Sequence, residues 1–339
     1  MSNTLLKKPA FEIKDSLYAY LRNHSRAINL PISYSELLKF SQGINVYDHK
    51  GKDTLWETVF YEPASISEIN DKLKQVYALL KLDGEPKSLQ HLSIDKIDYC
   101  TFGNSKPFRI KIINNINDNY DYFYVKQADA SRLFGLELDE LLSPNRVVYL
   151  VFEKTLIEEH IVGIPGDQFI ENNLKEAGHN EVRIAKEFIK FNERCYRRLL
   201  GDMRAYNFIV DITPDFDQIQ YRLRAIDFDQ QSYEGKRSFY LPYYFKENRP
   251  YVDFGIKHLS PESVEQYQKE ERSAMARRIY NDKTKLQELL FSMKEHQLTT
   301  PEKFKQLQKE LMQKEKIAGL AESTSMADLV YCLLKDLSK

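Results

Sequence analysis

The sequence has few cysteines, a single tryptophan and no excess of either charge. Its three cysteines, at positions 100, 195 and 332, lie far apart without a C-x-x-C spacing. This pattern excludes a zinc ribbon and a disulfide framework and favours a reducing compartment. Lys and Arg number 49 and Asp and Glu 50, so the chain has no general basic field to hold a nucleic acid or an anionic membrane surface. Any polyanion must therefore be bound at a local site.

Long apolar runs are absent as well. No stretch approaches the ~18 consecutive apolar residues that a membrane span needs. The N-terminal run MSNTLLKKPAFEIKDS carries charges and lacks the apolar centre of a signal peptide. We therefore expect a cytoplasmic protein that has neither a membrane nor a nucleic acid as its partner. With 339 residues, 42% of them hydrophobic, the chain can build one large or two ordinary cores.

The apolar pattern changes along the chain. From residue 11 to about 82, apolar residues recur every three or four positions, which predicts helices. Turn formers follow at 83–88, so we expect a helical N-terminal extension over residues 1–95. From 94 to 126 the runs IDYCTF, FRIKII and YDYFYVKQ are separated by Gly, Pro, Asn and Asp. This predicts a three-stranded antiparallel meander.

A second group of elements follows the meander. The sequence predicts a helix at 130–142 and two more strands, at 146–152 and 156–162. Together with the meander they form a compact α+β lobe, which we place at residues 96–163.

The rest of the chain, residues 164–339, is expected to be a mainly helical lobe with a helical C-terminal extension. Its longest periodic run is 181–200, and everything after Ser260 has a helical pattern. Between them lie GDMRAYNFIVDI, a polar turn that passes into a strand, and YRLRAIDF, a second strand.

Three oxygen-bearing side chains stand at the ends of these elements. Asp202 follows the long helix, Asn207 leads into the first strand, and Asp227 follows the second. Hard cations such as Mg²⁺ take oxygen ligands, and phosphoryl transfer needs a metal on the phosphates and a carboxylate that orients the attacking hydroxyl. An acid at a helix C-terminus also faces the negative end of the helix dipole, at a cost of ~0.3–1 kcal/mol, which favours a functional reason for Asp202.

The D-x-x-x-x-N spacing alone is not specific, because Asp167 and Asn172 share it without an apolar strand behind them. Order and context add specificity: a helix, the run GDMRAYNFIV, a hairpin and then AIDFDQ. In this order the segments resemble the catalytic and metal-binding loops of the protein-kinase-like superfamily. The Gly-Asp pair resembles its divergent bacterial branches, the aminoglycoside-phosphotransferase-like and HipA-like kinases.

The resemblance implies a two-lobed kinase-like fold, ATP and Mg²⁺ as cofactors, and a role for each loop residue. It makes Asp202 the catalytic base and Asn207 and Asp227 the metal ligands. It also makes Arg204 a cation that neutralises the transferring phosphate. The resemblance covers residues 95–260 and contributes nothing on the flanks.

Upstream residues take further roles by the same resemblance. Lys126, at the end of the third strand, is expected on the phosphates of ATP. Glu140 is expected to pair with it, and Glu137 is the alternative at a shorter spacing. Adenine is expected against the backbone of the strand edge that precedes the Gly-Pro turn, which comprises Glu159, His160, Ile161 and Val162.

The chain departs from the family pattern in three places. It has no G-x-G-x-x-G run: the turn GNSKP, expected to cover the phosphates, has only Gly103, and Asn104 and Ser105 would have to supply donors. The metal loop reads D-F-D rather than D-F-G, and no A-P-E follows. These departures weaken a conventional protein kinase most and leave room for a pseudokinase.

The sequence thus predicts an ATP- and Mg²⁺-dependent phosphotransferase that acts on a hydroxyl of a small molecule or protein. Two alternatives stay open: a pseudokinase scaffold that acts through its helical flanks, and adenylyl transfer on the same fold. The aromatic segment at 238–251 is either a wall for a substrate or a loop packed on the helical lobe.

Overall fold

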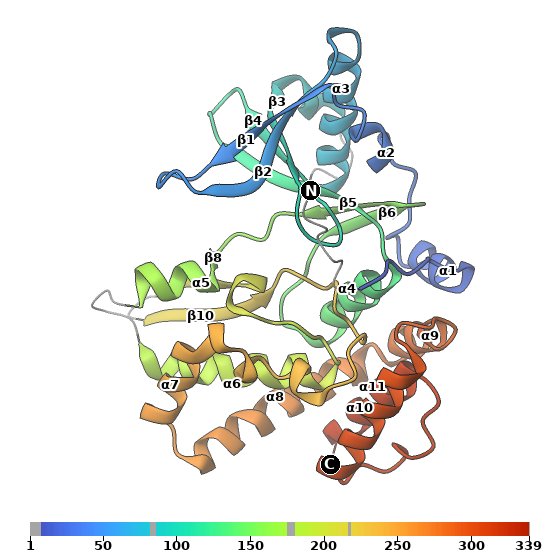
Figure 1. The fold of residues 1–339 in the computed structure, drawn as a ribbon, viewed down its shortest axis with the longest axis vertical. Coiled ribbons are helices and arrows are strands. Elements are labelled where there is room, and N and C mark those ends of the chain that lie inside the picture. The colour runs from blue at the N-terminus through green and yellow to red at the C-terminus, as the bar shows by residue number, and fades with distance from the viewer. Residues whose placement is uncertain (1–7, 82–85, 175–179, 216–217, 339) are drawn as a thin grey trace. The chain divides into compact units, whose positions relative to one another are not determined.

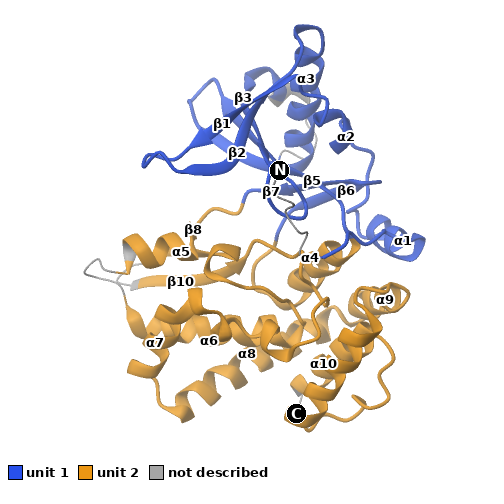
Figure 2. Ribbon diagram, viewed as in Figure 1, with its two compact units in different colours: residues 1–129, 147–160 blue, residues 130–146, 161–339 orange. Residues whose placement is uncertain are grey.

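The computed structural model describes residues 8–81, 86–174, 180–215 and 218–338 (Figure 1). The chain forms two compact units, which Figure 2 shows in two colours. Unit 1 contains residues 1–129 and 147–160, and unit 2 contains residues 130–146 and 161–339. The expected α+β class is confirmed, because an antiparallel sheet of seven strands occurs together with many helices.

Unit 1 is built on that sheet, whose strand order is β1-β2-β3-β4-β5-β7-β6. All neighbouring strands in it are antiparallel. The strands are β1 (Gln42–Tyr47), β2 (Asp53–Phe60), β3 (Leu92–Cys100), β4 (Phe108–Asn114), β5 (Tyr120–Gln127), β6 (Tyr149–Phe152) and β7 (Thr155–Glu159). The predicted meander is confirmed as β3 to β5, and the two strands expected after the next helix are confirmed as β6 and β7.

The core of unit 1 lies on one face of the sheet. Phe108 and Ile110 of β4 and Phe123 and Val125 of β5 are fully buried, and they belong to one cluster with Leu73 of a long helix. Alternate residues of a strand point to the same face, so the spacing of two brings these side chains together. The helices of this unit are α1 (Asp15–Asn23), α2 (Tyr34–Leu37) and α3 (Pro63–Lys81).

The hairpin β1–β2 corrects the expectation of a helical extension over residues 1–95. β2 pairs onward with β3, for example through Trp56 and Cys100, so the hairpin continues the sheet. In its turn Gly51 has φ +75°, a left-handed conformation that glycine adopts without steric cost. Most residues of both strands are at least partly exposed, so they lack the contrast between an apolar and a polar face that marks a half-buried strand.

The helix predicted at 130–142 is confirmed as α4 (Ala130–Leu142). It belongs to unit 2, which corrects its expected place in the lobe at 96–163. All of its residues except Glu140 are buried. A helix that is buried all round must find partners for its polar side chains, and those of α4 lie in unit 2, as described below.

Unit 2 is mostly helical, as predicted, and contains a small antiparallel sheet of order β10-β9-β8. Its strands are β8 (Ile164–Pro165), β9 (Phe208–Asp215) and β10 (Gln218–Ala225). Its other helices are α5 (Gly166–Gln168), α6 (Glu181–Arg197), α7 (Arg249–His258), α8 (Pro261–Asn281), α9 (Lys283–Lys294), α10 (Pro301–Lys314) and α11 (Met326–Lys335). None of the described helices combines the length and apolarity that crossing a membrane requires.

An aromatic cluster holds the β9–β10 hairpin against α6 and α7. The ring of Tyr251 stacks on Phe188 at 5.2 Å between centroids and on Phe169 at 6.4 Å, and it meets Phe208 at 5.6 Å. All four side chains are buried. These ring contacts position the start of β9 relative to α6. Asp202 follows the end of α6, and Asn207 directly precedes β9.

Candidate functional site

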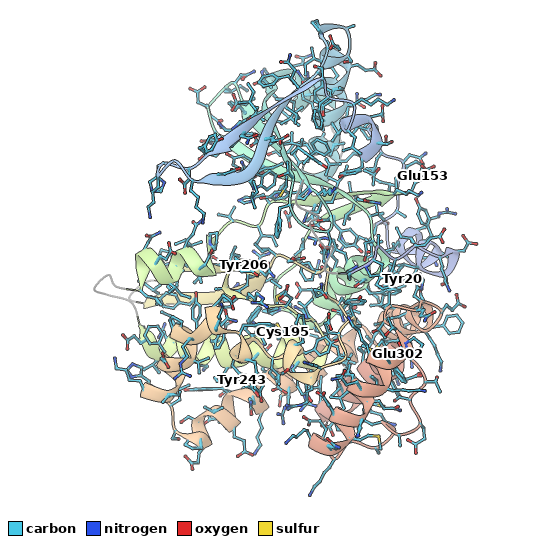
Figure 3. All side chains as sticks on the ribbon, in the orientation of Figure 1. Tyr20, Glu153, Cys195, Tyr206, Tyr243 and Glu302 are labelled. Carbon is cyan, nitrogen blue, oxygen red and sulfur yellow. The ribbon has the colours of Figure 1, made fainter. Side chains whose placement is uncertain are left out.

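The loop between α6 and β9 is held from both sides. After α6 ends, Leu200 forms a single antiparallel bridge with Gln231, and the Gly201 amide donates to the Gln230 carbonyl over 3.2 Å. A Cβ at Gly201 would lie 3.1 Å from the Phe239 ring and 3.2 Å from that carbonyl, so glycine suits this close approach. Tyr206, labelled in Figure 3, marks the loop.

Asp202 has an unusual backbone. Its φ is +58°, in the left-handed region, and its side chain is buried. Its amide donates to the Phe239 carbonyl over 3.2 Å. A residue other than glycine in this conformation costs about 1–3 kcal/mol, although Asp tolerates it better than most. The strain is consistent with a functional demand on the Asp202 carboxylate.

Asn207 ties the loop together. Its Nδ2 donates to the Asp202 carbonyl over 2.7 Å, and its own carbonyl accepts the amide of Ile226 over 3.0 Å. The second contact places Asn207 next to Asp227, just beyond the last pair of the β9–β10 ladder. Within the described part of the chain, the carboxamide oxygen of Asn207 accepts no hydrogen bond. This oxygen is therefore available as a ligand for a cation.

Arg204 links Asp202 to the segment that follows the D-F-D segment at 227–229. Its Nε donates to Asp202 Oδ1 over 2.7 Å and its Nη1 to Glu247 Oε1 over 2.8 Å. Its guanidinium also lies 4.7 Å from the centre of the Phe245 ring. Partial burial disfavours the charged guanidinium, but the two carboxylates outweigh burial and raise the pKa of Arg204. Glu247 is a residue that the sequence did not suggest.

Asp227 and Asp229 share a buried arginine. Arg132 of α4 donates through Nη1 to Oδ1 of Asp227 over 3.1 Å and to Oδ1 of Asp229 over 2.9 Å. Its Nη2 donates to the Ile226 carbonyl over 3.3 Å. The Arg132 side chain is only 2% exposed, whereas that of Asp227 is 33% exposed. The buried guanidinium therefore neutralises part of the negative charge of the D-F-D segment.

α4 is fastened to the D-F-D segment by further contacts. Ser131 Oγ lies 3.1 Å from the Asp229 carbonyl oxygen and 2.8 Å from that of Gln231, and it can donate its one proton to either. A Cβ at Gly135 would come within 2.9 Å of the Phe228 Cβ, so the helix and the loop approach closely there. This contact requires glycine on the helix.

Lys126 lies in unit 1 and makes an ion pair there. Its Nζ donates to Glu158 Oε2 on β7 over 2.5 Å, and both side chains are buried. The expected partners lie on α4 in unit 2: Glu137 is fully buried with Lys285 Nζ at 3.2 Å, and Glu140 Oε1 lies 3.5 Å from Arg146 Nε. The pairing of Lys126 with Glu140 or Glu137 stays a prediction, and Glu158 is an acidic partner that the spacing argument missed.

The strand edge expected to bind adenine is partly used by the sheet. The amide of Glu159 donates to the Val148 carbonyl over 3.0 Å, and that of His160 to the Tyr122 carbonyl over 3.3 Å. His160 Nδ1 lies 3.2 Å from the Tyr124 hydroxyl, and burial lowers the pKa of this imidazole. Of the four expected residues, Ile161 and Val162 are the ones whose amides this sheet does not use, and Val162 is 74% exposed.

The turn expected to cover the phosphates lies between β3 and β4. Gly103 has φ +94° and open space around the position of a Cβ, and the Ser105 carbonyl accepts the Gln127 amide over 3.4 Å. Gln127 directly follows Lys126, so the turn is joined to the strand that carries this lysine.

The donor set can be compared with what Mg²⁺ requires. Among the described residues, no group of three or more His, Cys, Asp and Glu side chains could hold a metal ion. Asp227 and Asn207 would supply two oxygen ligands. Mg²⁺ usually keeps several waters and is bound through one or two carboxylates together with substrate phosphates. The residues therefore fit a metal that arrives with a nucleotide rather than a closed metal centre.

Comparisons with known proteins return kinase structures at low similarity. One solved structure, "Titin kinase and its flanking domains", is 12% identical at a TM-score of 0.26 and covers 74% of this chain and 48% of that chain. Another, the autoinhibited serine kinase domain of the giant muscle protein titin, is 11% identical at a TM-score of 0.27 and covers 74% and 82%. The chain thus spans about half the length of the first structure. No protein-family model and no curated protein matches the chain.

Proposed function

We propose that the chain is an ATP- and Mg²⁺-dependent phosphotransferase that moves the γ-phosphoryl group to a hydroxyl of a small molecule or protein. The observation that carries the proposal is the hydrogen-bonded loop from Asp202 to Asn207. The loop brings the buried carboxylate of Asp202 and the carboxamide oxygen of Asn207 to one end of the β9–β10 hairpin. Asp227 lies at the same end, just after β10. Phosphoryl transfer uses these three groups as base and metal ligands.

Each residue has a task in this proposal. Asp202 accepts the proton of the acceptor hydroxyl, and Asn207 and Asp227 hold Mg²⁺, which neutralises charge on the phosphates. Arg204 already donates to Asp202, so the acceptor hydroxyl must share that carboxylate with the guanidinium or displace it. Lys126 binds the phosphates.

Glu158 holds Lys126 in the proposal, because the two side chains are in contact. This gives Glu158 the orienting role that the sequence suggested for Glu140. Gly201 before Asp202 supports placing the chain with the divergent bacterial branches of the superfamily, in which the pair Gly-Asp occurs.

Calorimetric titration with a non-hydrolysable ATP analogue, with and without Mg²⁺, tests the nucleotide site. We expect binding that requires Mg²⁺ and that Asp227→Asn weakens at least about tenfold, since a carboxylate ligand of the metal is lost. Asp253→Asn, which changes an exposed carboxylate on α7, is the matched control and should bind like the unaltered protein. Absence of Mg²⁺-dependent binding in the unaltered protein would contradict the proposal.

Turnover tests the base. Water serves as the acceptor in this assay, and the slow release of phosphate from ATP is measured. Asp202→Asn should bind the nucleotide as before but lose about 10²–10⁴-fold in this rate. Release of AMP in place of phosphate would instead indicate adenylyl transfer.

A pseudokinase scaffold is the second candidate, and Arg132 is the observation that favours it. A guanidinium that already pairs with Asp227 and Asp229 can stabilise the loop without a metal. For this candidate we expect no turnover with any acceptor, and Asp202→Asn should leave the biological activity of the protein unchanged.

A further inference from the structure

Unit 2 contains a cavity that the proposed transfer does not use. It measures about 490 Å³ and lies between α6, α7, α8 and the segment from Arg237 to Tyr243. Neither Asp202 nor Asp227 lines it. Sites for small molecules typically have about 300–1,000 Å³ and mostly apolar walls with a few polar groups. The cavity therefore has the size of a small-molecule site.

The walls of the cavity are mainly apolar. Tyr251 and Leu241 are buried side chains that line it, and Leu259 and Val264 line it from the ends of α7 and α8. Ile256 also lines it but is 70% exposed, which places this side chain at the mouth. Tyr243, labelled in Figure 3, belongs to the same lining. Such walls favour a ligand with an apolar body.

The polar part of the lining carries more cations than anions. Three arginines, Arg197, Arg237 and Arg272, line the cavity together with two carboxylates, Glu193 and Glu315. Arg237 is engaged by Glu315 Oε1 at 3.2 Å and by the Tyr196 hydroxyl at 2.9 Å.

Glu193 forms ion pairs with two of these arginines. Its Oε1 accepts from Arg197 Nε over 2.7 Å and from Arg272 Nε over 2.6 Å. Arg197 has Asp336 as a second acceptor, at 3.2 Å. Among the described residues, Glu193 is the one acceptor of Arg272, and it engages only Nε. Each guanidinium has five N–H donors, so the terminal amino groups of Arg272 can bind an acid group in two places.

We propose that this cavity binds an amphipathic small molecule that has an apolar body and one acidic group. The apolar body lies against Leu259 and Val264, which are only partly buried, and the acidic group accepts hydrogen bonds from Arg272. The site stands independently of the proposed phosphotransferase activity.

The probe for this site is 1-anilinonaphthalene-8-sulfonate, which has a naphthalene and a phenyl ring system and one sulfonate. It is titrated into the full-length protein and followed by fluorescence. The matched probe without the charge is N-phenyl-1-naphthylamine. We expect saturable binding of the sulfonate at one site and binding of the uncharged probe at least about tenfold weaker, because it lacks the charge-assisted hydrogen bonds.

Two variants and a control locate the site. Arg272→Gln should weaken the sulfonate at least about tenfold and leave the uncharged probe unchanged. Val264→Trp should occupy part of the cavity beside Leu259 and weaken the binding of both probes. Phe291→Ala removes an exposed side chain on α9 that does not line the cavity, and it should bind both probes normally.

Competition keeps the proposal falsifiable if Val264→Trp does not fold. Decanoate should displace the sulfonate probe from the unaltered protein, whereas 1-decanol should do so at least about tenfold less well. The proposal is overturned if no saturable binding occurs, if Arg272→Gln binds the sulfonate as tightly as the unaltered protein, or if Phe291→Ala loses as much binding as Arg272→Gln.

Discussion

Replacing Arg132 by Met should destabilise unit 2 strongly. The guanidinium is almost fully buried and donates to Asp227, Asp229 and the Ile226 carbonyl. Its removal leaves two carboxylates close together, since both accept from the same nitrogen. Breaking a buried ion pair by removing one partner costs about 3–5 kcal/mol. At about 2–4 °C per kcal/mol for a unit of this size, the melting temperature should fall by roughly 6–20 °C.

The assay can separate the two units. Trp56 is the single tryptophan and lies in the sheet of unit 1, whereas Arg132 lies in unit 2. Urea unfolding followed by far-ultraviolet circular dichroism reports both units, and Trp56 fluorescence reports unit 1. We expect the dichroism transition to move to lower urea by more than the fluorescence transition.

Two comparisons make the reasoning refutable. Arg249→Met removes an exposed arginine that pairs with Asp253, and it should cost less than ~0.5 kcal/mol. Adding Asp229→Asn to Arg132→Met should restore part of the lost stability, because one of the two repelling charges is gone. A loss no larger than that of Arg249→Met would refute the argument.

Three further predictions follow from single sites. Asp328 caps the N-terminus of α11, and its pKa of about 2 lies below the ordinary 3.8. The stability that this carboxylate contributes is therefore fully present above pH 3.8 and is lost as the pH falls through 2. In thermal melts, Asp328→Ala should cost about 0.5–2 kcal/mol at pH 7 and nothing below pH 2. Gly166→Ala would bring a Cβ within 2.5 Å of the Phe208 ring and should cost about 1–3 kcal/mol in urea unfolding. The control is Gly255→Ala in α7, where the new Cβ would meet open space. It should stabilise the protein by about 0.5–1 kcal/mol. Burial lowers the pKa of His160 below 6.5. As the pH falls, the imidazole is protonated more readily in the unfolded chain than in the folded protein, so the folded protein loses stability below pH 6.5. His160→Gln should reduce this loss of stability in thermal melts between pH 7 and about 5.

Local pattern was enough for most elements of the fold. Strands β3 to β5 and the β9–β10 hairpin follow from apolar runs separated by turn formers, and α4 and α6 follow from their helical period. The β1–β2 hairpin could not be found this way, because its exposed faces give no apolar contrast. The membership of α4 in unit 2 could not be found either, since it depends on contacts with residues far along the chain.

The same distinction applies to the candidate site. Asp202 and Asn207 lie five residues apart, so a motif can contain both. Glu158 meets Lys126 from 32 positions away and Glu247 meets Arg204 from 43 positions away, so no spacing rule reaches them. The signal that could have suggested Arg132 is its place as the single cation in an apolar, acidic helix, because a buried cation requires an acidic partner.

The buried polar residues of α4 explain why this helix belongs with the D-F-D segment. Arg132 pairs with Asp227 and Asp229, and Ser131 donates to the backbone of that segment. Glu137 pairs with Lys285 and Asp139 with Arg198, both in unit 2. Separating α4 from unit 2 would break all of these ion pairs and hydrogen bonds at once. Any conformational change within unit 2 must therefore move α4 and the D-F-D segment together.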